Sequence, residues 1–344
     1  MKKKSKKKAA GVATVAVFSL LLFVAAGGLL YVNNLLNLVN RDVITGNASM
    51  TESEIYADEP IHNVSDSVED LNDTKSDFEV VQKYEMLNES GIENILLIGS
   101  DRRSTNENGR SDSMMIVSIN HNTGKIHIVS LMRAMYVYIP RASGGVWGML
   151  NAAYSWGGPQ LLIDTVEANF CVNIDRYVIV DFSSFTSVID LVGGVDIPVT
   201  AAEAEYMRKH GCNIPSAGTY TLNGKEALTY SRIRYIDNDF VRTGRQRKVL
   251  EAVLGKMKTV NVMQLPSLAN AVLPMLSTNL SNGEVLNYVG QASKLLSYRI
   301  SQRMLPIENE DGSTYSGIMY VNGMEVYKVN YAKNVKALHE FLRS

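Results

Sequence analysis

Carboxylate and guanidinium side chains recur where predicted strands and helices begin or end, and they are the residues best able to do chemistry. Asp101 follows one predicted strand, Asp112 precedes the next, and Arg133 comes directly after a third. The remaining candidates are basic or amide side chains: Arg103, Arg232, Arg234, Arg242, Arg245 and Gln246. Each one alone is typical of a turn, a helix cap or a solvated surface. Together they indicate one shared site.

This set of side chains suits a diphosphate held with a divalent cation. Guanidinium groups bind phosphate oxygens in a bidentate fashion, and a helix start also favours anions. In an extended segment Arg232 and Arg234 would face the same side. A carboxylate ~4 Å from a phosphate oxygen is repelled by roughly 4 kcal/mol at an effective dielectric constant of 20. Asp101 and Asp112 therefore predict a bridging metal ion, Mg²⁺ by preference and Mn²⁺ as the alternative.

The formal net charge of −1 hides a strong segregation of charge along the 344 residues. Residues 2–8 hold six lysines, residues 41–90 hold 13 acids against three bases, and residues 225–258 hold nine bases against four acids. This pattern favours membrane orientation and anion binding over nucleic-acid binding. The hydrophobic content of 46% excludes a disordered or fibrous chain.

Other reaction classes lack their motifs. The five histidines are scattered without the i, i+4 spacing of a zinc helix, and the sequence has neither a G-x-S-x-G elbow nor a P-loop. Two cysteines, Cys171 and Cys212, exclude a disulfide-rich scaffold. They can be a disulfide, two inert buried thiols, or a nucleophile with a bystander. We expect the disulfide, which would close a loop of about 40 residues and stabilise the domain by ~3–4 kcal/mol.

Residues 9–32 form an uncharged apolar stretch after the basic tail 1–8. At ~1.5 Å per residue the stretch reaches ~36 Å, enough to cross a hydrocarbon core of about 30 Å. The alternatives are a cleaved signal peptide and a buried core helix. We predict a single-pass anchor in the cell membrane, with the lysines cytoplasmic and the rest of the chain outside. Residues 33–90 then read as an acidic spacer with a short helix at 80–87, and residues 91–344 as the catalytic domain.

Short apolar runs and helical periodicities alternate from residue 91 onward. Strands are predicted at 95–98, 114–119, 125–132, 174–181, 316–320 and 325–329, and helices at 159–170, 182–191, 224–230, 243–257, 266–277, 283–296 and 334–342. Strands interspersed with helices predict a layered α/β domain with a mixed sheet.

The ordered motifs resemble those of the LytR-CpsA-Psr family of bacterial cell envelopes, from about Asn94 to Arg343. They are L-L-I-G-S-D-x-R, R-S-D-S-M-M, Arg133 followed by Y-V-Y-I-P, N-A-A-Y before G-G, D-L-V-G-G-V, L-N-G-K-E-A-L, R-x-R and R-x-x-R-Q. The resemblance implies an α/β/α sandwich around a mixed central sheet that buries a polyprenyl tail. It also implies a Mg²⁺-dependent phosphotransferase that moves a glycopolymer, such as teichoic acid or capsule, from an undecaprenyl-pyrophosphate carrier to peptidoglycan.

The constellation and the resemblance together assign the site residues. Asp101 and Asp112 are expected to hold the metal, the arginines to neutralise the diphosphate, and Gln246 to orient it. The expected partners are a polyprenyl-pyrophosphate lipid, a lipid-linked glycopolymer, peptidoglycan and the membrane, and no nucleic acid is expected.

Position 134 departs from the family pattern. Family members usually carry aspartate after the arginine at this strand end, whereas this chain has Ala134. An aspartate there would orient Arg133, assist the metal or accept a proton. We therefore expect lipid binding with slow transfer. The alternatives are a polyprenyl-diphosphate-binding module and a pyrophosphate hydrolase.

Overall fold

The computed structural model describes residues 40–41, 46–56, 59–101, 111–234, 236–259, 265–307 and 316–344. No helix within these ranges is long and apolar enough to cross a membrane. The predicted membrane helix at 9–32 lies outside them.

A six-stranded mixed sheet forms the centre of the domain, with strand order β10-β3-β2-β1-β6-β9. Its strands are β1 (Ile92–Ser100), β2 (Ser111–Asn120), β3 (Lys125–Leu131), β6 (Arg176–Asp181), β9 (Ser277–Thr278) and β10 (Arg299–Leu305). The first three strands form an antiparallel meander, whereas β6 runs parallel to β1 and β10 runs parallel to β3. The predicted mixed sheet is confirmed.

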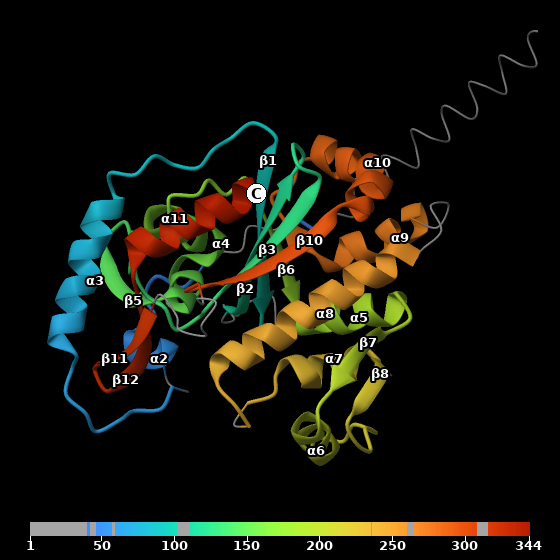
Figure 1. Ribbon diagram of the computed structural model, residues 1–344, viewed down its shortest axis with the longest axis horizontal. Helices are drawn as coiled ribbons and strands as arrows, with labels where there is room; N and C mark the ends of the chain where they lie inside the picture. Colours follow the sequence, from blue (N-terminus) through green and yellow to red (C-terminus); the bar gives the residue numbers. More distant parts are fainter. Residues whose placement is uncertain are drawn as a thin grey trace, which may run out of the picture.

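Helices cover both faces of this sheet (Figure 1). On one side lie α3 (Val68–Val81), α4 (Leu150–Phe170) and α11 (Tyr331–Arg343). On the other side lie α5 (Phe182–Leu191), α7 (Gly224–Ser231), α8 (Asp239–Thr259), α9 (Leu265–Val272) and α10 (Asn282–Ser297). This arrangement agrees with the predicted layered α/β fold.

Smaller elements complete the described part of the chain. They are α2 (Glu52–Ile55), the hairpin of β4 (Tyr136–Ile139) and β5 (Val146–Met149), the pair β7 (Val195–Val199) and β8 (Gly218–Leu222) with α6 (Ala201–Lys209) between them, a 3₁₀ turn (Leu273–Met275), and the hairpin of β11 (Ser316–Val321) and β12 (Met324–Val329). The last hairpin turns at Asn322 and Gly323, both with positive φ, as its sequence predicts.

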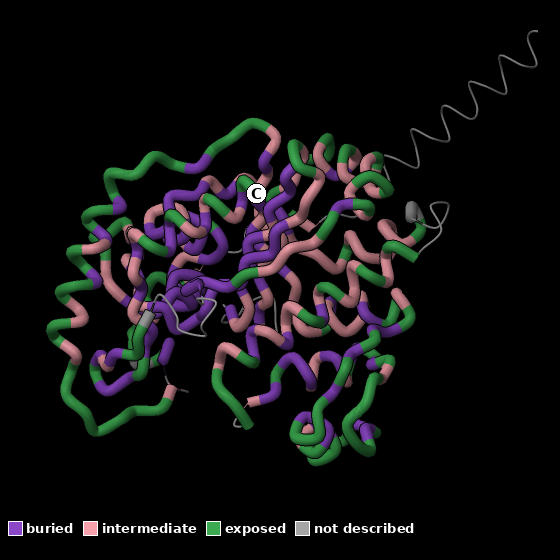
Figure 2. Tube along the Cα trace, in the orientation of Figure 1, coloured by how far each residue is buried: buried purple, intermediate pink, exposed green. Residues whose placement is uncertain are grey.

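The two faces of the sheet are packed differently. Leu96 and Ile98 of β1 are buried in a main core shared with α4 and α11. Their neighbours Leu97 and Gly99 point to the opposite face, because side chains alternate along a strand, and there they line a cavity. Figure 2 shows the same contrast, with buried residues concentrated on the α4 side and mostly intermediate exposure along α8, α9 and α10.

The segment predicted as a spacer is packed against the domain from residue 46 onward. Ile55, Phe78, Val81 and Leu87 are buried in the main core, and α3 packs along α11. The helix predicted at 80–87 is also wrong, since α3 begins at Val68 and ends at Val81. Acidic residues dominate the composition here, but they occupy the solvent side of a helix whose few apolar residues are enough to dock it.

The predicted disulfide is wrong, because Cys171 and Cys212 are free buried thiols. Cys171 ends α4 in the main core and donates a hydrogen bond to the Val81 carbonyl (3.2 Å). Cys212 belongs to a second core built by α6, α7, β7 and β8. The two thiols therefore serve separate packing clusters.

Candidate functional site

Residues of α8 line three adjoining pockets. The first, the apolar pocket, lies between β1, β2 and β6 of the sheet and α5, α7, α8 and residues 272–276. Its apolar walls include Leu97, Met115, Val178, Val180, Phe182, Phe185, Leu228, Val249, Leu250 and Val253. Polar groups gather at one end, where Asp112, Arg232 and Gln246 also line it. The cavity has about 1160 Å³ of unfilled space, including its open mouth.

The second, the basic pocket, adjoins the polar end of the apolar pocket. It is lined by Asp112, Tyr206, His210, Lys225, Leu228, Thr229, Ser231, Arg232, Arg234, Arg242 and Gln246. Four of these side chains are cationic and one is a carboxylate. Such a concentration of positive charge suits a multiply charged anion.

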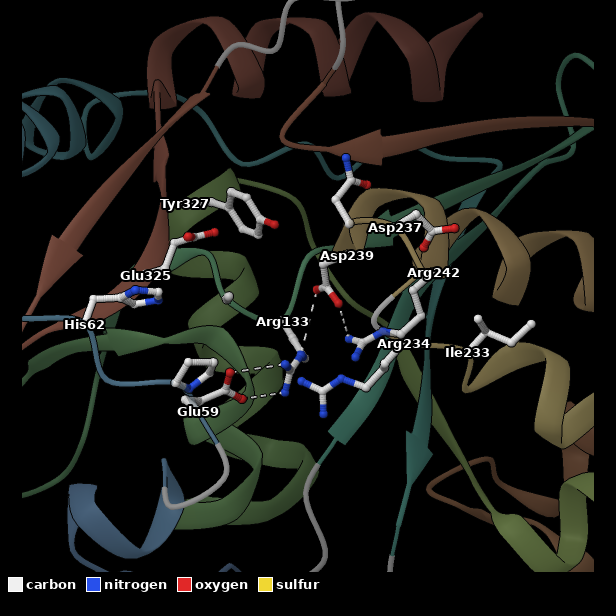
Figure 3. A pocket seen from close by; sticks show the side chains of 13 residues that line it. Glu59, His62, Arg133, Ile233, Arg234, Asp237, Asp239, Arg242, Glu325 and Tyr327 are labelled. Carbon is white, nitrogen blue, oxygen red and sulfur yellow. Dashed lines mark hydrogen bonds and ion pairs between the residues drawn. The ribbon is translucent and has the colours of Figure 1, made fainter. Parts of the chain in front are cut away.

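The third, the mixed-charge pocket, is shown in Figure 3. It is lined by Glu59, Pro60, His62, Arg133, Ala134, Ile233, Arg234, Asp237, Asn238, Asp239, Arg242, Glu325 and Tyr327. Four carboxylates here face three guanidinium groups. Its walls come from the N-terminal segment, the end of β3, the start of α8 and β12.

The pockets lie in a row. The apolar and basic pockets share five residues, Asp112 and Arg232 among them. The basic and mixed-charge pockets share Arg234 and Arg242, whereas the apolar and mixed-charge pockets share none of their lining residues. The basic pocket is therefore the middle of the row.

A β-bulge directs Asp112 toward these pockets. Gly99 pairs with Ser113 and Ser100 pairs with Ser111, so Asp112 is the extra residue between them. The same register places Asp101, which follows Ser100, at this end of the two neighbouring strands. The predicted partner Arg103 lies outside the described residues.

Arg133 leaves the end of β3 and is largely neutralised by carboxylates. Glu59 binds it in a bidentate fashion, with Nη1–Oε1 at 2.6 Å and Nη2–Oε2 at 3.2 Å. Asp239 Oδ2 lies 3.8 Å from Nε and Asp112 Oδ1 lies 4.0 Å from Nη1. Burial lowers the pKa of Arg133, but these carboxylates outweigh burial and raise the pKa above its ordinary value.

Arg242 is less well neutralised. It is 6% exposed, its Nη2 pairs with Asp239 Oδ1 at 2.7 Å, and no described residue offers its Nε a hydrogen-bond acceptor. Burial lowers the pKa of Arg242, and the Arg133 guanidinium lowers it further, although Asp239 opposes both. An additional anion beside Arg242 would relieve this excess of positive charge.

The structure brings most, but not all, of the predicted cation set together. Arg232, Arg234, Arg242 and Gln246 line the basic pocket with Asp112. Arg232 is the C-cap of α7 and stacks over the Phe182 ring at 4.6 Å, so the predicted extended R-x-R segment is wrong.

Arg245 does not join them. It is 1% exposed and lines none of the three pockets. Its Nε donates to Glu203 (2.7 Å), and its other nitrogens pair with Asp237. Burial lowers the pKa of Arg245, but Asp237 and Glu203 outweigh burial and raise it. Arg245 lies only ~60° around the helix axis from Arg242, but this offset is enough for its side chain to pack on α6 through Glu203.

Several site residues escaped the sequence prediction. Glu59 fell in the predicted spacer, and Glu325 lies on a hairpin far along the chain from the arginine motifs. Lys225 belongs to the L-N-G-K-E-A-L motif, but nothing in the sequence indicates a role for it in the site. Asp239 carried a usable signal, because an acid three residues before Arg242 in a helix is placed to pair with it.

Comparison with known proteins identifies the relatives of this chain. The sequence model of the LytR_cpsA_psr family matches residues 56–340. The polyisoprenyl-teichoic acid–peptidoglycan teichoic acid transferase TagU of Oceanobacillus iheyensis is 33% identical over 267 residues, covering 73% of this chain and 77% of that protein. The regulatory protein MsrR of Staphylococcus aureus is 27% identical over 285 residues, covering 82% and 84%.

The fold has solved counterparts as well. A structure of TagT bound to LI-WTA superimposes with a TM-score of 0.60 at 25% identity, covering 76% of this chain and 94% of that one. The match of the family model, the identity to TagU and the shared fold agree with the motifs quoted from the sequence. The chain belongs to the LytR-CpsA-Psr family.

Proposed function

We propose that this protein is a membrane-anchored phosphotransferase that moves a glycopolymer from a polyprenyl-diphosphate carrier to peptidoglycan outside the cytoplasm. One observation carries the proposal, namely that the apolar pocket opens directly into the basic pocket. A polyprenyl diphosphate has the same order of parts, with an apolar tail joined to a highly charged head. The relatedness to TagU, named as a teichoic acid transferase, supports the reaction class.

In this assignment the tail lies between the sheet and α5, α7 and α8. The diphosphate lies among Arg232, Arg234 and Arg242, with Lys225 as an additional cation. Gln246 Nε2 lies 3.5 Å from the Asp112 carbonyl, which places its amide at the junction of the two pockets. Arg245 is assigned to the stability of the domain and not to the substrate.

We assign Asp112, which lines the basic pocket, and Asp101, which follows the end of β1, to a Mg²⁺ ion that also binds substrate. Within the described ranges no group of three His, Cys, Asp or Glu side chains could hold a metal ion by itself. Mg²⁺ in proteins is commonly held by one or two carboxylates together with substrate phosphates and water. When bound, the ion would neutralise phosphate charge beside Asp112. The residues of the chain supply the binding and orientation.

The transfer step exchanges a phosphoanhydride bond for a phosphodiester bond. An acceptor hydroxyl oxygen bonds to the phosphorus that carries the glycopolymer, while the bond from that phosphorus to the bridging oxygen breaks. The bridging oxygen leaves with the polyprenyl phosphate, and the hydroxyl proton goes to a base. Arginines that contact the phosphate oxygens stabilise the transition state by positioning and charge.

The proposed activity is slow, and the reason is Ala134. It lines the mixed-charge pocket beside Arg133 and has no carboxylate to offer. Of the tasks expected from an aspartate there, Glu59 supplies the orientation of Arg133 through its bidentate contact. Glu59 does not replace the acid–base task, because position 134 itself carries no acid–base group.

The test uses the full chain in detergent or nanodiscs, with a radiolabelled lipid-linked glycopolymer, Mg²⁺ and peptidoglycan. A covalent polymer–peptidoglycan product is the expected result. Release of free polymer phosphate would instead indicate hydrolysis. Lipid binding without either product would indicate a binding module, and the absence of lipid binding would contradict the proposal.

A further inference from the structure

The mixed-charge pocket has a chemistry different from that of the basic pocket next to it. Its carboxylates include Glu59, Asp237, Asp239 and Glu325, which would repel a polyphosphate. Carboxylates beside an aromatic ring are well suited to hydroxyl-rich, uncharged groups, since carboxylates accept hydrogen bonds from hydroxyls. We propose that this pocket binds the acceptor sugar and that Glu325 accepts the proton of its attacking hydroxyl. This inference rests on the proposed function.

The order of the pockets indicates that the mixed-charge pocket binds the acceptor and not another part of the donor lipid. In phosphoryl transfer the attacking and leaving oxygens lie roughly in line across the phosphorus. If the tail occupies the apolar pocket and the diphosphate the basic pocket, the leaving oxygen points toward the tail. The attacking hydroxyl must then come from the other end of the row, and the mixed-charge pocket is at that end.

Buried polar atoms at this pocket point to a ligand as well. Arg133 and Arg242 are 8% and 6% exposed, and within the part of the chain that the structure describes the Nε atom of each has no hydrogen-bond acceptor. Oδ2 of Asp239, 3.8 Å from Arg133 Nε, likewise has no hydrogen-bond donor among the described residues. A bound group with both donors and acceptors, such as a sugar with its hydroxyls and amide, would satisfy atoms of both kinds.

Glu325 differs from the other carboxylates of the pocket. Glu59 is bound by Arg133, Asp239 by Arg242 and Asp237 by Arg245, so a guanidinium group already occupies each of these carboxylates. Glu325 of β12 is exposed, and its carboxylate has no hydrogen bond or ion pair to the described part of the chain. Its carboxylate is therefore the one most available to take a proton.

Tyr327 lies two residues further along the same strand, so both side chains face the pocket. Its ring packs edge-on against Phe240, with centroids 4.9 Å apart, which fixes its position. Burial and the nearby Asp239 and Glu325 raise the pKa of Tyr327, so its hydroxyl stays protonated and can donate to a sugar oxygen. The acceptor oxygen would then lose its proton to Glu325 as it bonds to phosphorus, and polyprenyl phosphate would leave.

The test compares Glu325→Gln and Tyr327→Phe with wild type and with the control Glu340→Gln, an exposed glutamate on α11 outside all three pockets. Two measurements are made on the full chain: the Kd for polyprenyl diphosphate, and the Kd for a soluble peptidoglycan fragment with the lipid bound. Transfer kinetics follow with each substrate varied in turn.

We expect Glu325→Gln to lower kcat with acceptor by ~10²-fold or more. Tyr327→Phe should weaken binding of the peptidoglycan fragment by about tenfold, as expected for one lost hydrogen bond. Both variants should keep the lipid Kd within about twofold of wild type, because neither residue lines the basic or apolar pocket.

Three outcomes would overturn the inference. If both variants lost lipid affinity as strongly as they lost affinity for the peptidoglycan fragment, this pocket would be part of the diphosphate site. A raised KM for the lipid-linked polymer, with the acceptor KM unchanged, would place the donor polymer here. Unchanged fragment binding in Tyr327→Phe together with unchanged turnover in Glu325→Gln would remove the acceptor from it. Failure of wild type to bind the lipid would instead contradict the proposed function. The Kd for polyprenyl diphosphate reports this outcome independently of the peptidoglycan fragment.

Discussion

Two arginines on α8, three residues apart, have opposite environments. Arg245 is 1% exposed and lies between two carboxylates, Glu203 and Asp237. Arg242 faces the pockets, shares the single carboxylate Asp239 with Arg133, and has a lowered pKa. Both looked alike in the sequence, as parts of one R-x-x-R-Q motif. The number of carboxylates around a guanidinium separates a structural arginine from one that needs an anion from outside the chain.

The largest expected effect tests the structural side of this comparison. Arg245→Ala would leave two carboxylates, one of them deeply buried, without their cation. Removing one partner of a buried ion pair typically costs about 3–5 kcal/mol of unfolding free energy. Chemical denaturation of both variants measures it, and we expect Arg242→Ala to lose less than half as much. Equal losses would show that the two sites do not differ in this way.

The next effect tests the substrate side. Arg242→Ala should weaken polyprenyl-diphosphate binding by about 1.5–3 kcal/mol, which is roughly 10–150-fold in Kd. Arg245→Ala, measured at a temperature where it remains folded, should bind within about twofold of wild type. Binding is followed by titration with fluorescent lipid at constant Mg²⁺. A larger loss in Arg245→Ala than in Arg242→Ala would reverse the assignment.

Much of the fold could be predicted because local patterns decide it. Short apolar runs located β1, β2 and β3, alternating apolar residues located β6, and glycines with positive φ ended α5 as expected. The docking of α3 could not be predicted, since it depends on contacts with α11, which lies at the other end of the chain. The contact of Glu59 with Arg133 and the position of Glu325 in the mixed-charge pocket also depend on residues far apart in the sequence. No local pattern could therefore predict them.

A smaller effect separates the tail site from the head site. Val180→Phe adds a ring to the wall of the apolar pocket and leaves the basic pocket unchanged. It should weaken binding of a long polyprenyl diphosphate by about 1–3 kcal/mol, the usual cost of overpacking. Affinity for inorganic diphosphate should not change. Loss of affinity for both ligands would mean that the tail does not occupy this cavity.

Ala134→Asp tests the missing acid–base group beside Arg133. An aspartate here would add a second proton acceptor to the mixed-charge pocket. We expect transfer to rise at least about tenfold at saturating Mg²⁺ and lipid, with little change in lipid Kd. Glu59→Gln is the matched comparison, because it weakens the existing carboxylate contact with Arg133. Equal turnover of wild type and Ala134→Asp would show that position 134 has no catalytic role.

The smallest effect concerns pH and returns to Arg245. Burial raises the pKa of Glu203, but hydrogen bonds from Thr200 and Arg245 outweigh burial and hold the pKa below its ordinary 4.5. Well above pH 4.5 Glu203 is ionised in the folded and the unfolded chain alike. As the pH falls below 4.5 the unfolded chain takes up the proton first, so this contribution to stability is lost toward the lower folded pKa. Glu203→Gln should therefore reduce the slope of unfolding free energy against pH between about pH 5 and pH 3, measured by urea denaturation. An unchanged slope would mean that Glu203 is not ionised beside Arg245. Arg245 would then have one charged carboxylate partner, as Arg242 has, and the two arginines would no longer differ in this respect.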